Sequence, residues 1–481
     1  MAEETFLIAG GVIIGILIFM IAYRFFIITS HNSMKTLSID EFNKLSSSID
    51  LACVQEKKSL IKVDAIVPEF VRVVYASDDT GVMPKVTEGI KTGKMSSGNY
   101  VCMQFKTEQK PRCQKVKCKV FMPFIGSLEP WNDLKLLVNR ILGKPMIKEY
   151  SFIILKTSYG VDLTYEDYPS FKSPVAVIAY IPLTTDGKVD VTKTGSWKDE
   201  SKSNLESYII AYSNELADTL THGTRYKFFI DRESKPNINY YLVLARMMYE
   251  DIPTRNGVLD LERVLNDVDV CGLSQDGIRE IWLWVYDNRE YVPIEFSLVM
   301  GYNIKDKWNV DRDLDGKIDY GIIGVKTLNL PVCESSYSVH TFIVSSSKGV
   351  SLGNYTHSIE AILSHVDEEV WRSFNSSCGT TDCPPNLDWP LCLYKWNSEV
   401  SKETDCIDWK PDGGVAKPIN CHEWYGVNCK DDDGLEYKVW WMQNIPGRNN
   451  GIKLEDGRRV KDWWAFIAEF DNAIKDKRLI E

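Results

Sequence analysis

An apolar run near the amino terminus most constrains what this chain can fold into. Phe6 to Tyr23 is a stretch of 18 uncharged residues, and Phe25 to Ile28 extends it beyond Arg24. At 1.5 Å per residue, this length crosses the hydrocarbon layer of a bilayer, which is about 30 Å thick. The preceding residues, Met-Ala-Glu-Glu-Thr, lack the positive charge of a signal peptide, and no A-x-A-like cleavage site follows. The sequence therefore predicts an uncleaved transmembrane anchor over residues 1–29, with Phe6–Ile28 in the membrane.

The cysteine content indicates on which side of the membrane the rest of the chain lies. The chain holds 12 cysteines, and six of them fall between Cys378 and Cys429. Such density is typical of compartments in which disulfides persist. Zinc sites would need C-x2-C pairs, and the sequence contains none. Arg24 and Lys35 favour an inward orientation by the positive-inside rule, but two charges weigh less than 12 cysteines. We therefore expect a single-pass protein of the cell membrane with an extracellular body.

Composition excludes some partners. The chain has 56 Lys and Arg against 67 Asp and Glu, a net charge of −11, and no basic block. Nucleic acid is therefore not expected as a partner, because neutralising phosphates requires clustered basic residues. Two N-x-[ST] sequons, at Asn354 and Asn375, are compatible with a glycoprotein on the cell exterior.

Patterning divides the rest of the chain into three parts. Residues 30–58 are polar, with apolar residues at roughly helical spacing, and predict a stalk helix. These apolar residues are Leu37, Ile39, Phe42, Leu45, Ile49 and Leu51. Residues 59–160 contain short Val-rich runs separated by turn residues, which indicates a small β-sandwich-like domain. Residues 161–481 mix buried strands, such as Val175–Leu183, with amphipathic helices. They predict a larger α+β head domain that is rich in disulfides and Trp.

An acidic loop resembles a calcium-binding loop. Carboxylates occupy its positions 1, 3, 5 and 9, a glycine occupies position 6, and position 7 would contribute a backbone carbonyl. The predicted ligands are Asp311, Asp313, Asp315, Lys317 and Asp319. Position 12 is Ile322 instead of the usual Glu, so the loop is not a complete EF-hand. We expect Ca²⁺ to make an external loop rigid here, the alternative being a solvated acidic turn.

A predicted helix over residues 354–374 carries a second group of polar residues. His357 and Glu360 lie one turn apart on the same helix face, with His365 at its edge. An imidazole and a carboxylate at this spacing can bind a metal or share a proton in acid–base chemistry. The alternative is a polar helix face without chemistry.

Tryptophan is concentrated in the carboxy-terminal third. Nine of the 14 Trp residues lie between Trp371 and Trp464, interleaved with six cysteines. In a disulfide-rich region with few regular elements, large rings fill the space between bridges, so packing is the expected role. One or two of these rings could instead stack on sugars or contact a partner.

An ordered series of motifs resembles a family of secreted prokaryotic proteins that has no assigned activity. The motifs cover about residues 205 to 475. They are Glu280-Ile-Trp-Leu-Trp284, Pro293-Ile-Glu295, His357-Ser-Ile-Glu360, Cys378-Gly-Thr-Thr-Asp382-Cys-Pro-Pro-Asn386, Trp440-Trp-Met-Gln-Asn-Ile-Pro-Gly447 and Trp463-Trp464. The amino terminus is similar to single-span archaeal surface proteins.

The resemblance implies site residues, with one departure. The family carries further histidines around His357 and a histidine where this chain has Asp382. It implies Glu295, His357 and Glu360 as catalytic or metal-binding residues, with Asp382 as a substitute oxygen ligand. A transition metal would then bind weakly or not at all.

Three functions remain open on the sequence. The first is a non-catalytic surface protein whose calcium-stabilised head binds a glycan, a surface protein or another copy of itself. The second is a membrane-tethered hydrolase that uses Glu295, His357, Glu360 and Asp382, with a metal or as an acid–base pair. The third is a pilin-like filament subunit assembled through Phe6–Tyr23.

Overall fold

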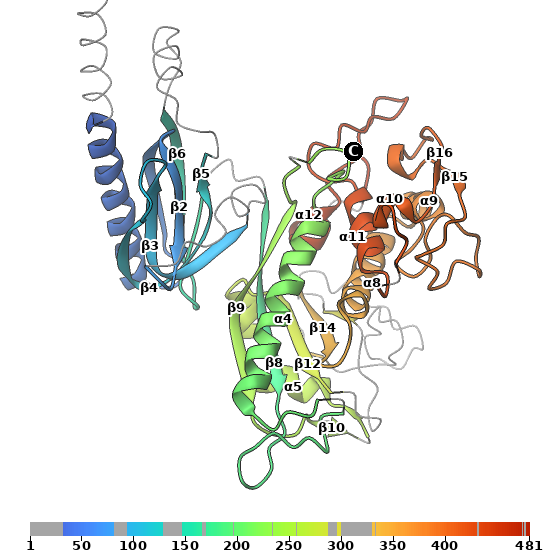
Figure 1. Cartoon of the computed structure of the whole chain (residues 1–481), viewed down its shortest axis with the longest axis horizontal. Coiled ribbons are helices and arrows are strands. Elements are labelled where there is room, and N and C mark those ends of the chain that lie inside the picture. Colours follow the sequence, from blue (N-terminus) through green and yellow to red (C-terminus); the bar gives the residue numbers. More distant parts are fainter. Residues whose placement is uncertain are drawn as a thin grey trace, which may run out of the picture. The chain divides into compact units, whose positions relative to one another are not determined.

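A computed structural model describes residues 32–80, 94–127, 147–165, 170–286, 296–299 and 330–481, apart from the single positions Ser196, Glu233, Asn256, Val332, Asp431, Ile474, Asp476 and Lys477. The chain divides into two compact units, Met1–Tyr168 and Pro169–Glu481 (Figure 1). Each unit has its own hydrophobic core.

The first unit contains a seven-stranded sheet with the order β1-β6-β7-β4-β3-β2-β5. Its strands are β1 (Leu60–Pro68), β2 (Val71–Ser77), β3 (Met95–Phe105), β4 (Arg112–Pro123), β5 (Ile125–Gly126), β6 (Ile147–Lys156) and β7 (Val161–Tyr165). Neighbouring strands are antiparallel except β4 and β7, which are parallel. The Val-rich runs therefore form strands, as predicted, because β-branched side chains pack well on a pleated surface.

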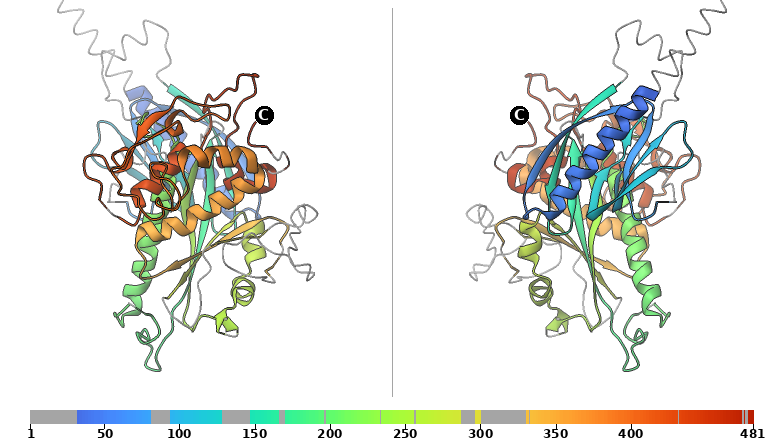
Figure 2. Two further views of the ribbon diagram at one scale, coloured as in Figure 1. Left: turned by 90° about the vertical axis from the view of Figure 1, so that its right-hand side faces the viewer. Right: turned by 90° about the vertical axis from the view of Figure 1, so that its left-hand side faces the viewer.

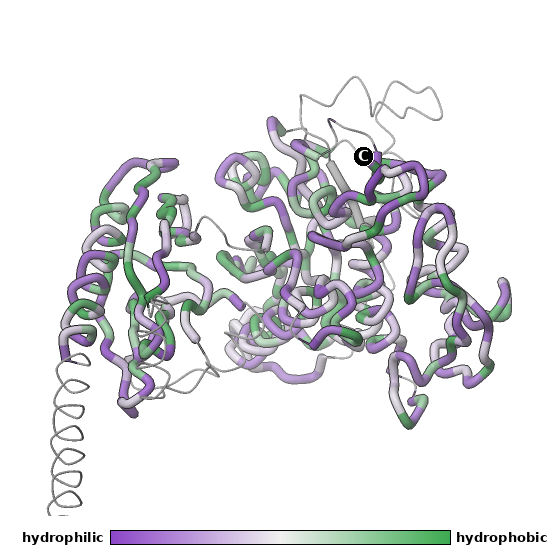
Figure 3. Tube along the Cα trace, turned by 90° about the horizontal axis from the view of Figure 1, so that it is seen from above, coloured by the Kyte–Doolittle hydropathy of each residue, from purple (hydrophilic) through white to green (hydrophobic). Residues whose placement is uncertain are grey.

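A helix over residues 32–54 packs against this sheet. Its apolar stripe, which includes Phe42, Leu45 and Ile49, belongs to the same core as the strands. The Cys53–Cys118 disulfide joins the end of the helix to β4. Figure 3 shows the alternation of hydrophobic and hydrophilic residues along this helix that one buried face requires.

Two predictions for this part of the chain are therefore wrong. The apolar stripe predicts a stalk helix, but its residues are buried against a sheet. The β-rich domain is not β-sandwich-like, because the described strands form one sheet whose apolar face is covered by the helix. The hydrophobic pattern showed that the helix had an apolar face, but not which surface that face would contact.

The second unit contains a five-stranded sheet with the order β13-β14-β12-β8-β9. The strands are β8 (Phe171–Tyr180), β9 (Ile238–Met248), β12 (Glu280–Val285), β13 (Phe296–Val299) and β14 (Tyr337–Ile343). The pairs β8–β9, β8–β12 and β12–β14 are parallel, and only β13 is antiparallel to its neighbour. The head is thus organised around a mostly parallel sheet with helices, which corrects the expected α+β class to α/β.

Helices cover this sheet. α4 (Lys202–Gly223), α8 (Lys348–Val366) and α11 (Leu435–Asn444) contribute to the core on one face, where α4 runs along the strands (Figures 1 and 2). On the other face, Tyr180 lies close enough to Asp267 of α5 (Leu261–Asp267) to be affected by its charge. Because both faces are covered, β8 and β12 are apolar almost throughout instead of alternating.

The remaining elements are short. They are β10 (Thr254–Arg255), β11 (Val258–Leu259), α6 (Val270–Gln275), α9 (Glu368–Cys378), β15 (Lys402–Thr404), η2 (Cys406–Asp408), β16 (Lys417–Ile419), α10 (His422–Tyr425), α12 (Trp464–Ala468) and α13 (Phe470–Ala473). The predicted helix over residues 354–374 is two helices, since α8 ends at Val366 and α9 begins at Glu368. Asp367 between them caps α9 by accepting the N–H of Val370 at 3.3 Å.

All 12 cysteines are paired, as their number and density predicted. The bridges are Cys53–Cys118, Cys102–Cys113, Cys271–Cys333, Cys378–Cys406, Cys383–Cys392 and Cys421–Cys429. Each bridge lies within one unit. Six bridges require an oxidising environment to form and persist.

The expected membrane anchor is corrected. Among the helices that the structure describes, none combines the length and the apolar character needed to cross a bilayer. The predicted segment, Phe6–Ile28, lies outside the described residues. We therefore do not propose a single-pass protein of the cell membrane or a membrane-tethered enzyme. The hypothesis of a pilin-like filament depends on the same residues, Phe6–Tyr23, and is not proposed either.

Candidate active site around His357

Helix α8 positions the first two predicted site residues. Ser347 caps the helix by accepting the N–H of Val350 at 3.3 Å. Tyr355 and Ile359 face the core, whereas His357 and Glu360 project from the opposite side and are partly exposed. This division follows from helix geometry, because residues two positions apart point about 200° apart.

His357 lies between two carboxylates. Its Nδ1 is 3.0 Å from Oε2 of Glu360, and its Nε2 is 3.6 Å from Oδ2 of Asp382. The other oxygen of Glu360, Oε1, accepts the backbone N–H of Thr381 at 2.9 Å. Glu360 therefore orients the imidazole and fixes the loop that carries Asp382. The structure brings together three of the four predicted residues.

The loop from Cys378 to Cys383 presents Asp382 in a tight turn. The N–H of Cys383 donates to the Thr380 carbonyl at 3.2 Å, and the N–H of Thr380 donates back to the Cys383 carbonyl at 2.9 Å. Gly379 begins this turn with φ at +73°, and a Cβ at that position would lie 2.2 Å from the Cys383 carbonyl oxygen. Only glycine fits there.

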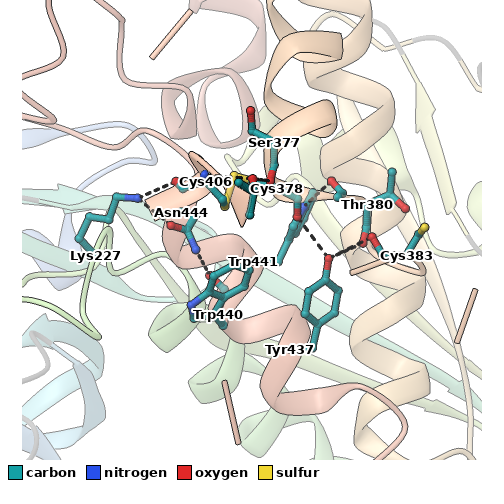
Figure 4. Close-up of a disulfide and its surroundings, with 12 residues drawn as sticks. Lys227, Ser377, Cys378, Thr380, Cys383, Cys406, Tyr437, Trp440, Trp441 and Asn444 are labelled. Carbon is teal, nitrogen blue, oxygen red and sulfur yellow. Dashed lines mark hydrogen bonds between the residues drawn. A yellow bond between two sulfur atoms is a disulfide. The ribbon is translucent and has the colours of Figure 1, made fainter. Parts of the chain in front are cut away.

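Two disulfides hold the ends of this loop. Cys378 is bonded to Cys406, and Cys383 is bonded to Cys392. The Cys406 carbonyl in turn accepts a hydrogen bond from Nζ of Lys227 at 3.3 Å (Figure 4). Burial lowers the pKa of Lys227 to about 7, because the charged amine is removed from water.

Aromatic side chains bind the carbonyls of the same loop. The Tyr437 hydroxyl donates to the Thr380 carbonyl at 2.8 Å, and Nε1 of Trp441 donates to the Gly379 carbonyl at 3.2 Å (Figure 4). Nε1 of Trp396 donates to the Thr381 carbonyl at 3.3 Å. Two motifs far apart in the sequence, C-G-T-T-D-C and the W-W segment, thus meet here. Each aromatic donor satisfies a carbonyl that is partly or fully buried.

Tyr437 remains a hydrogen-bond donor at this position. Burial first, and then the charges of Glu360 and Asp382, raise the pKa of Tyr437 well above its usual value. The hydroxyl is therefore protonated at physiological pH, and the loop keeps its anchor.

The geometry suits a divalent cation. We assign the ring proton to Nδ1 from its contact with Glu360, which leaves a lone pair on Nε2 facing the Asp382 carboxylate. Two ligand atoms of a tetrahedral site with bonds of about 2.1 Å lie about 3.4 Å apart, close to the observed separation. A carboxylate bonded to the other ring nitrogen, as Glu360 is here, is the usual support of a metal-binding histidine.

Other predicted residues cannot be placed. Glu295 lies outside the described residues, and so do the predicted calcium ligands Asp311, Asp313, Asp315, Lys317 and Asp319. The calcium loop therefore stays a prediction. Nothing supports glycan attachment at Asn354, whose side-chain nitrogen donates to the Thr341 carbonyl at 3.3 Å.

A further group combines one histidine with two cysteines. Cys421, His422 and Cys429 have potential ligand atoms close together. However, Cys421 and Cys429 are bonded to each other, so neither offers a thiolate to a metal. We interpret this group as structural.

The carboxy-terminal Trp residues are mostly packing residues, as expected. Eight of the nine between Trp371 and Trp464 are buried, with exposed fractions of 9% or less. Trp389 is the exception at 76%. It lies in the loop closed by the Cys383–Cys392 bridge, beside the exposed Leu391 and Tyr394. The backbone N–H of Tyr394 donates to the Asp382 carbonyl at 2.9 Å, so this exposed loop adjoins the His357 site.

Sequence reasoning missed a second pair of polar residues, Glu280 and His340. Both are buried within strands, and Nε2 of His340 is 3.1 Å from Oε2 of Glu280. A signal was present in the sequence. Glu280 begins a strand that is otherwise apolar, His340 lies in the middle of β14, and a carboxylate is seldom fully buried without a partner.

Comparisons with known proteins identify no relative: no family model, curated protein or solved structure matches this chain. The resemblance to a secreted prokaryotic family stays a prediction.

Proposed function

We propose that the second unit is a metal-dependent hydrolase whose site is formed by His357, Glu360 and Asp382. The observation that carries this proposal is the position of the His357 ring between two carboxylates, with Nε2 and Asp382 separated by the spacing of two metal ligands. Glu360 acts through His357, because it holds the ring and the Asp382 loop in register.

The chemistry follows from these ligands. Nε2 of His357 and the Asp382 carboxylate would hold a divalent cation, which would lower the pKa of a water molecule and polarise the bond to be cleaved. Two protein ligands leave positions open for water and substrate, as a catalytic site requires. Sites of this kind usually have three protein ligands, so we expect weak binding unless a further residue contributes. Glu295 is the candidate that the sequence provides.

Metal binding and hydrolysis should depend on the same residues. Calorimetric titration of the full chain with Zn²⁺ and with Mn²⁺, after removal of metal, should show one site that is lost in His357→Ala and Asp382→Asn. Chromogenic esters, phosphoesters, glycosides and peptides should reveal an activity lost in the same variants.

His365→Ala is the matched control, because His365 is exposed on the same helix and outside the trio. It should bind metal and hydrolyse substrate like the unaltered protein. Equal metal binding in His357→Ala and the unaltered protein would contradict the proposal. Glu295→Gln tests whether the remaining predicted residue contributes.

The exposure of Trp389 favours a second function, the binding of a glycan or a surface protein through the loop that contains it. An indole surface with 76% exposure can stack on a sugar ring or enter a partner's pocket. We expect Trp389→Ala to reduce retention of the protein on insoluble polysaccharides such as chitin or cellulose. Val427→Ala, at a position that is 90% exposed, is the control. Equal retention of both variants on every polysaccharide would argue against glycan binding.

A further inference from the structure

The second unit contains a cavity of about 220 Å³ on the opposite side of α8 from His357. The first residues of β8, β12 and β14 line it, together with α8 and the segment from α12 to α13. Tyr355, Ser358 and Ile362 are the residues of α8 that line it, and all three are buried. The cavity therefore lies at the amino ends of the parallel strands, separate from the site proposed above.

Its buried wall is a network centred on the Glu280 carboxylate. Glu280 and Ser338 are paired across β12 and β14, and the Ser338 hydroxyl donates to Oε2 at 2.9 Å. The Tyr355 hydroxyl donates to Oε1 at 3.1 Å. Nε2 of His340 lies 3.1 Å from Oε2, and the His340 ring stacks on Tyr355 with centroids 4.4 Å apart. His340 is 1% exposed, Glu280 6% and Ser338 8%, so little of this network is open to bulk water.

This network disfavours anionic ligands and favours ligands that donate a hydrogen bond. A carboxylate has about four lone-pair sites, and the Ser338 and Tyr355 hydroxyls use two of those on Glu280, so Glu280 can accept a further hydrogen bond. An anionic group at this wall would be repelled. A molecule that donates a hydroxyl proton would gain a charge-assisted hydrogen bond.

The charged residues that line the cavity balance. Lys172 and Arg279 are positive, and Glu280 and Glu469 are negative. Asp471, which does not line the cavity, is paired with Arg279 at 3.2 Å. The lining as a whole therefore favours no net charge on a ligand. At about 30 Å³ per water molecule, the volume holds about seven waters, and drug-sized ligands usually occupy 300 Å³ or more.

We infer that this cavity binds a neutral polyhydroxylated molecule of the size of one sugar ring, with a hydroxyl donated to Glu280. The serine hydroxyls and Asn472 of the lining supply both donors and acceptors for the other hydroxyls of such a ligand. The Tyr337 and Phe470 rings supply apolar surface for its carbon atoms.

Saturation-transfer NMR and calorimetry on the full chain test this inference with D-glucose, D-galactose and myo-inositol as probes. At least one of these polyols should bind. L-lysine and inorganic phosphate serve as charged comparison probes, and neither should bind at this site. Glu280→Gln should weaken polyol binding about tenfold or more, because it removes a charged hydrogen-bond acceptor.

A second variant covers the possibility that Glu280→Gln disturbs the buried network. Ala468 is partly exposed on the cavity wall, and Ala468→Trp should fill the cavity and abolish polyol binding without touching that network. Asp382→Asn is the control and should bind polyol normally, which separates this inference from the hydrolase proposal. Absence of binding by all three polyols, binding unchanged in both variants, or binding of lysine alone would overturn the inference.

Discussion

At the scale of single residues, Asp462 shows how burial changes the chemistry of a side chain. Burial raises the pKa of Asp462 to about 6, although the N–H of Trp464 and the charge of Arg448 act in the opposite direction. The carboxyl of Asp462 therefore binds a proton more tightly in the folded state than in the unfolded state. Folding loses stability as the pH rises from the unfolded value, near 3.8, through 6.

Asp462→Asn should therefore stabilise the protein at neutral pH. We expect the free energy of unfolding to rise by about 1 to 3 kcal/mol at pH 7.5, and the gain to disappear below about pH 4. Thermal unfolding measured across this pH range checks the prediction. Asp456→Asn is the control, since the Arg458 backbone N–H and side chain lower the pKa of this exposed carboxyl. It should give no gain at pH 7.5, and a gain equal to that of Asp462→Asn would contradict the explanation.

Gly379 is the second residue whose substitution has a defined physical cost. Gly379→Ala combines a positive φ with a Cβ 2.2 Å from the Cys383 carbonyl oxygen. We expect a loss of about 2 kcal/mol or more in the free energy of unfolding, measured by chemical denaturation. Gly426→Ala has a similar φ, +68°, but its Cβ would meet nothing within 4 Å. A larger loss of stability in Gly379→Ala than in Gly426→Ala would measure the clash with the Cys383 carbonyl oxygen. Equal losses in the two variants would show that the turn at Gly379 tolerates a Cβ.

At the scale of elements, the sequence predicted helix faces and strands better than their partners. Apolar spacing predicts a helix within residues 30–58, and the structure has one over 32–54. The apolar run Val175–Leu183 predicts a buried strand, which overlaps β8. Local pattern could not show that β8 pairs in parallel with β9 and β12, because these strands are separated by long segments of chain. That parallel pairing determines the class of the second unit.

The residues of the candidate site also differ in how well the sequence predicts them. His357 and Glu360 could be predicted because they lie one turn apart on one helix, and helix geometry brings such residues together. Asp382 came only from the resemblance, since its approach depends on a turn held by Tyr437 and Trp441. Glu280 and His340 were not predicted as a pair because they meet through strand pairing and lie among core residues.

Ile49 tests the packing of the helix over residues 32–54. Ile49 is 0% exposed and Leu51, two positions away on the same helix, is 52% exposed. Ile49→Ala should cost about 2 to 5 kcal/mol, and Leu51→Ala less than about 0.5 kcal/mol. Hydrogen exchange followed by mass spectrometry should show faster exchange in the sheet of the first unit for Ile49→Ala alone. Equal effects of the two variants would restore the interpretation of this helix as an exposed stalk.

At the scale of the whole molecule, the disulfides are the main covalent support of both units. The Cys53–Cys118 and Cys271–Cys333 bridges close loops of 65 and 62 residues. In the loop-entropy description, each bridge of this size contributes about 4 kcal/mol. The number of cysteines predicted complete pairing, but spacing could not predict the partners, because Cys53 and Cys118 meet only once a helix packs on a sheet.

Reduction should therefore destabilise both units. The oxidised protein should contain no thiol that reacts with a maleimide after unfolding, and peptide mapping should recover the six bridges. Reduction should lower the midpoint of thermal unfolding by about 10 °C or more. Free thiols in freshly purified protein, or an unchanged midpoint after complete reduction, would contradict this account.

The central claim is that His357 and Asp382 form one metal site. Anomalous diffraction at the zinc edge, from crystals of the full chain soaked in Zn²⁺, tests it most directly. We predict a peak about 2.1 Å from Nε2 of His357 and from an oxygen of Asp382, absent in His357→Ala crystals soaked identically. A zinc-soaked crystal of the unaltered protein without a peak between these two side chains would contradict the claim.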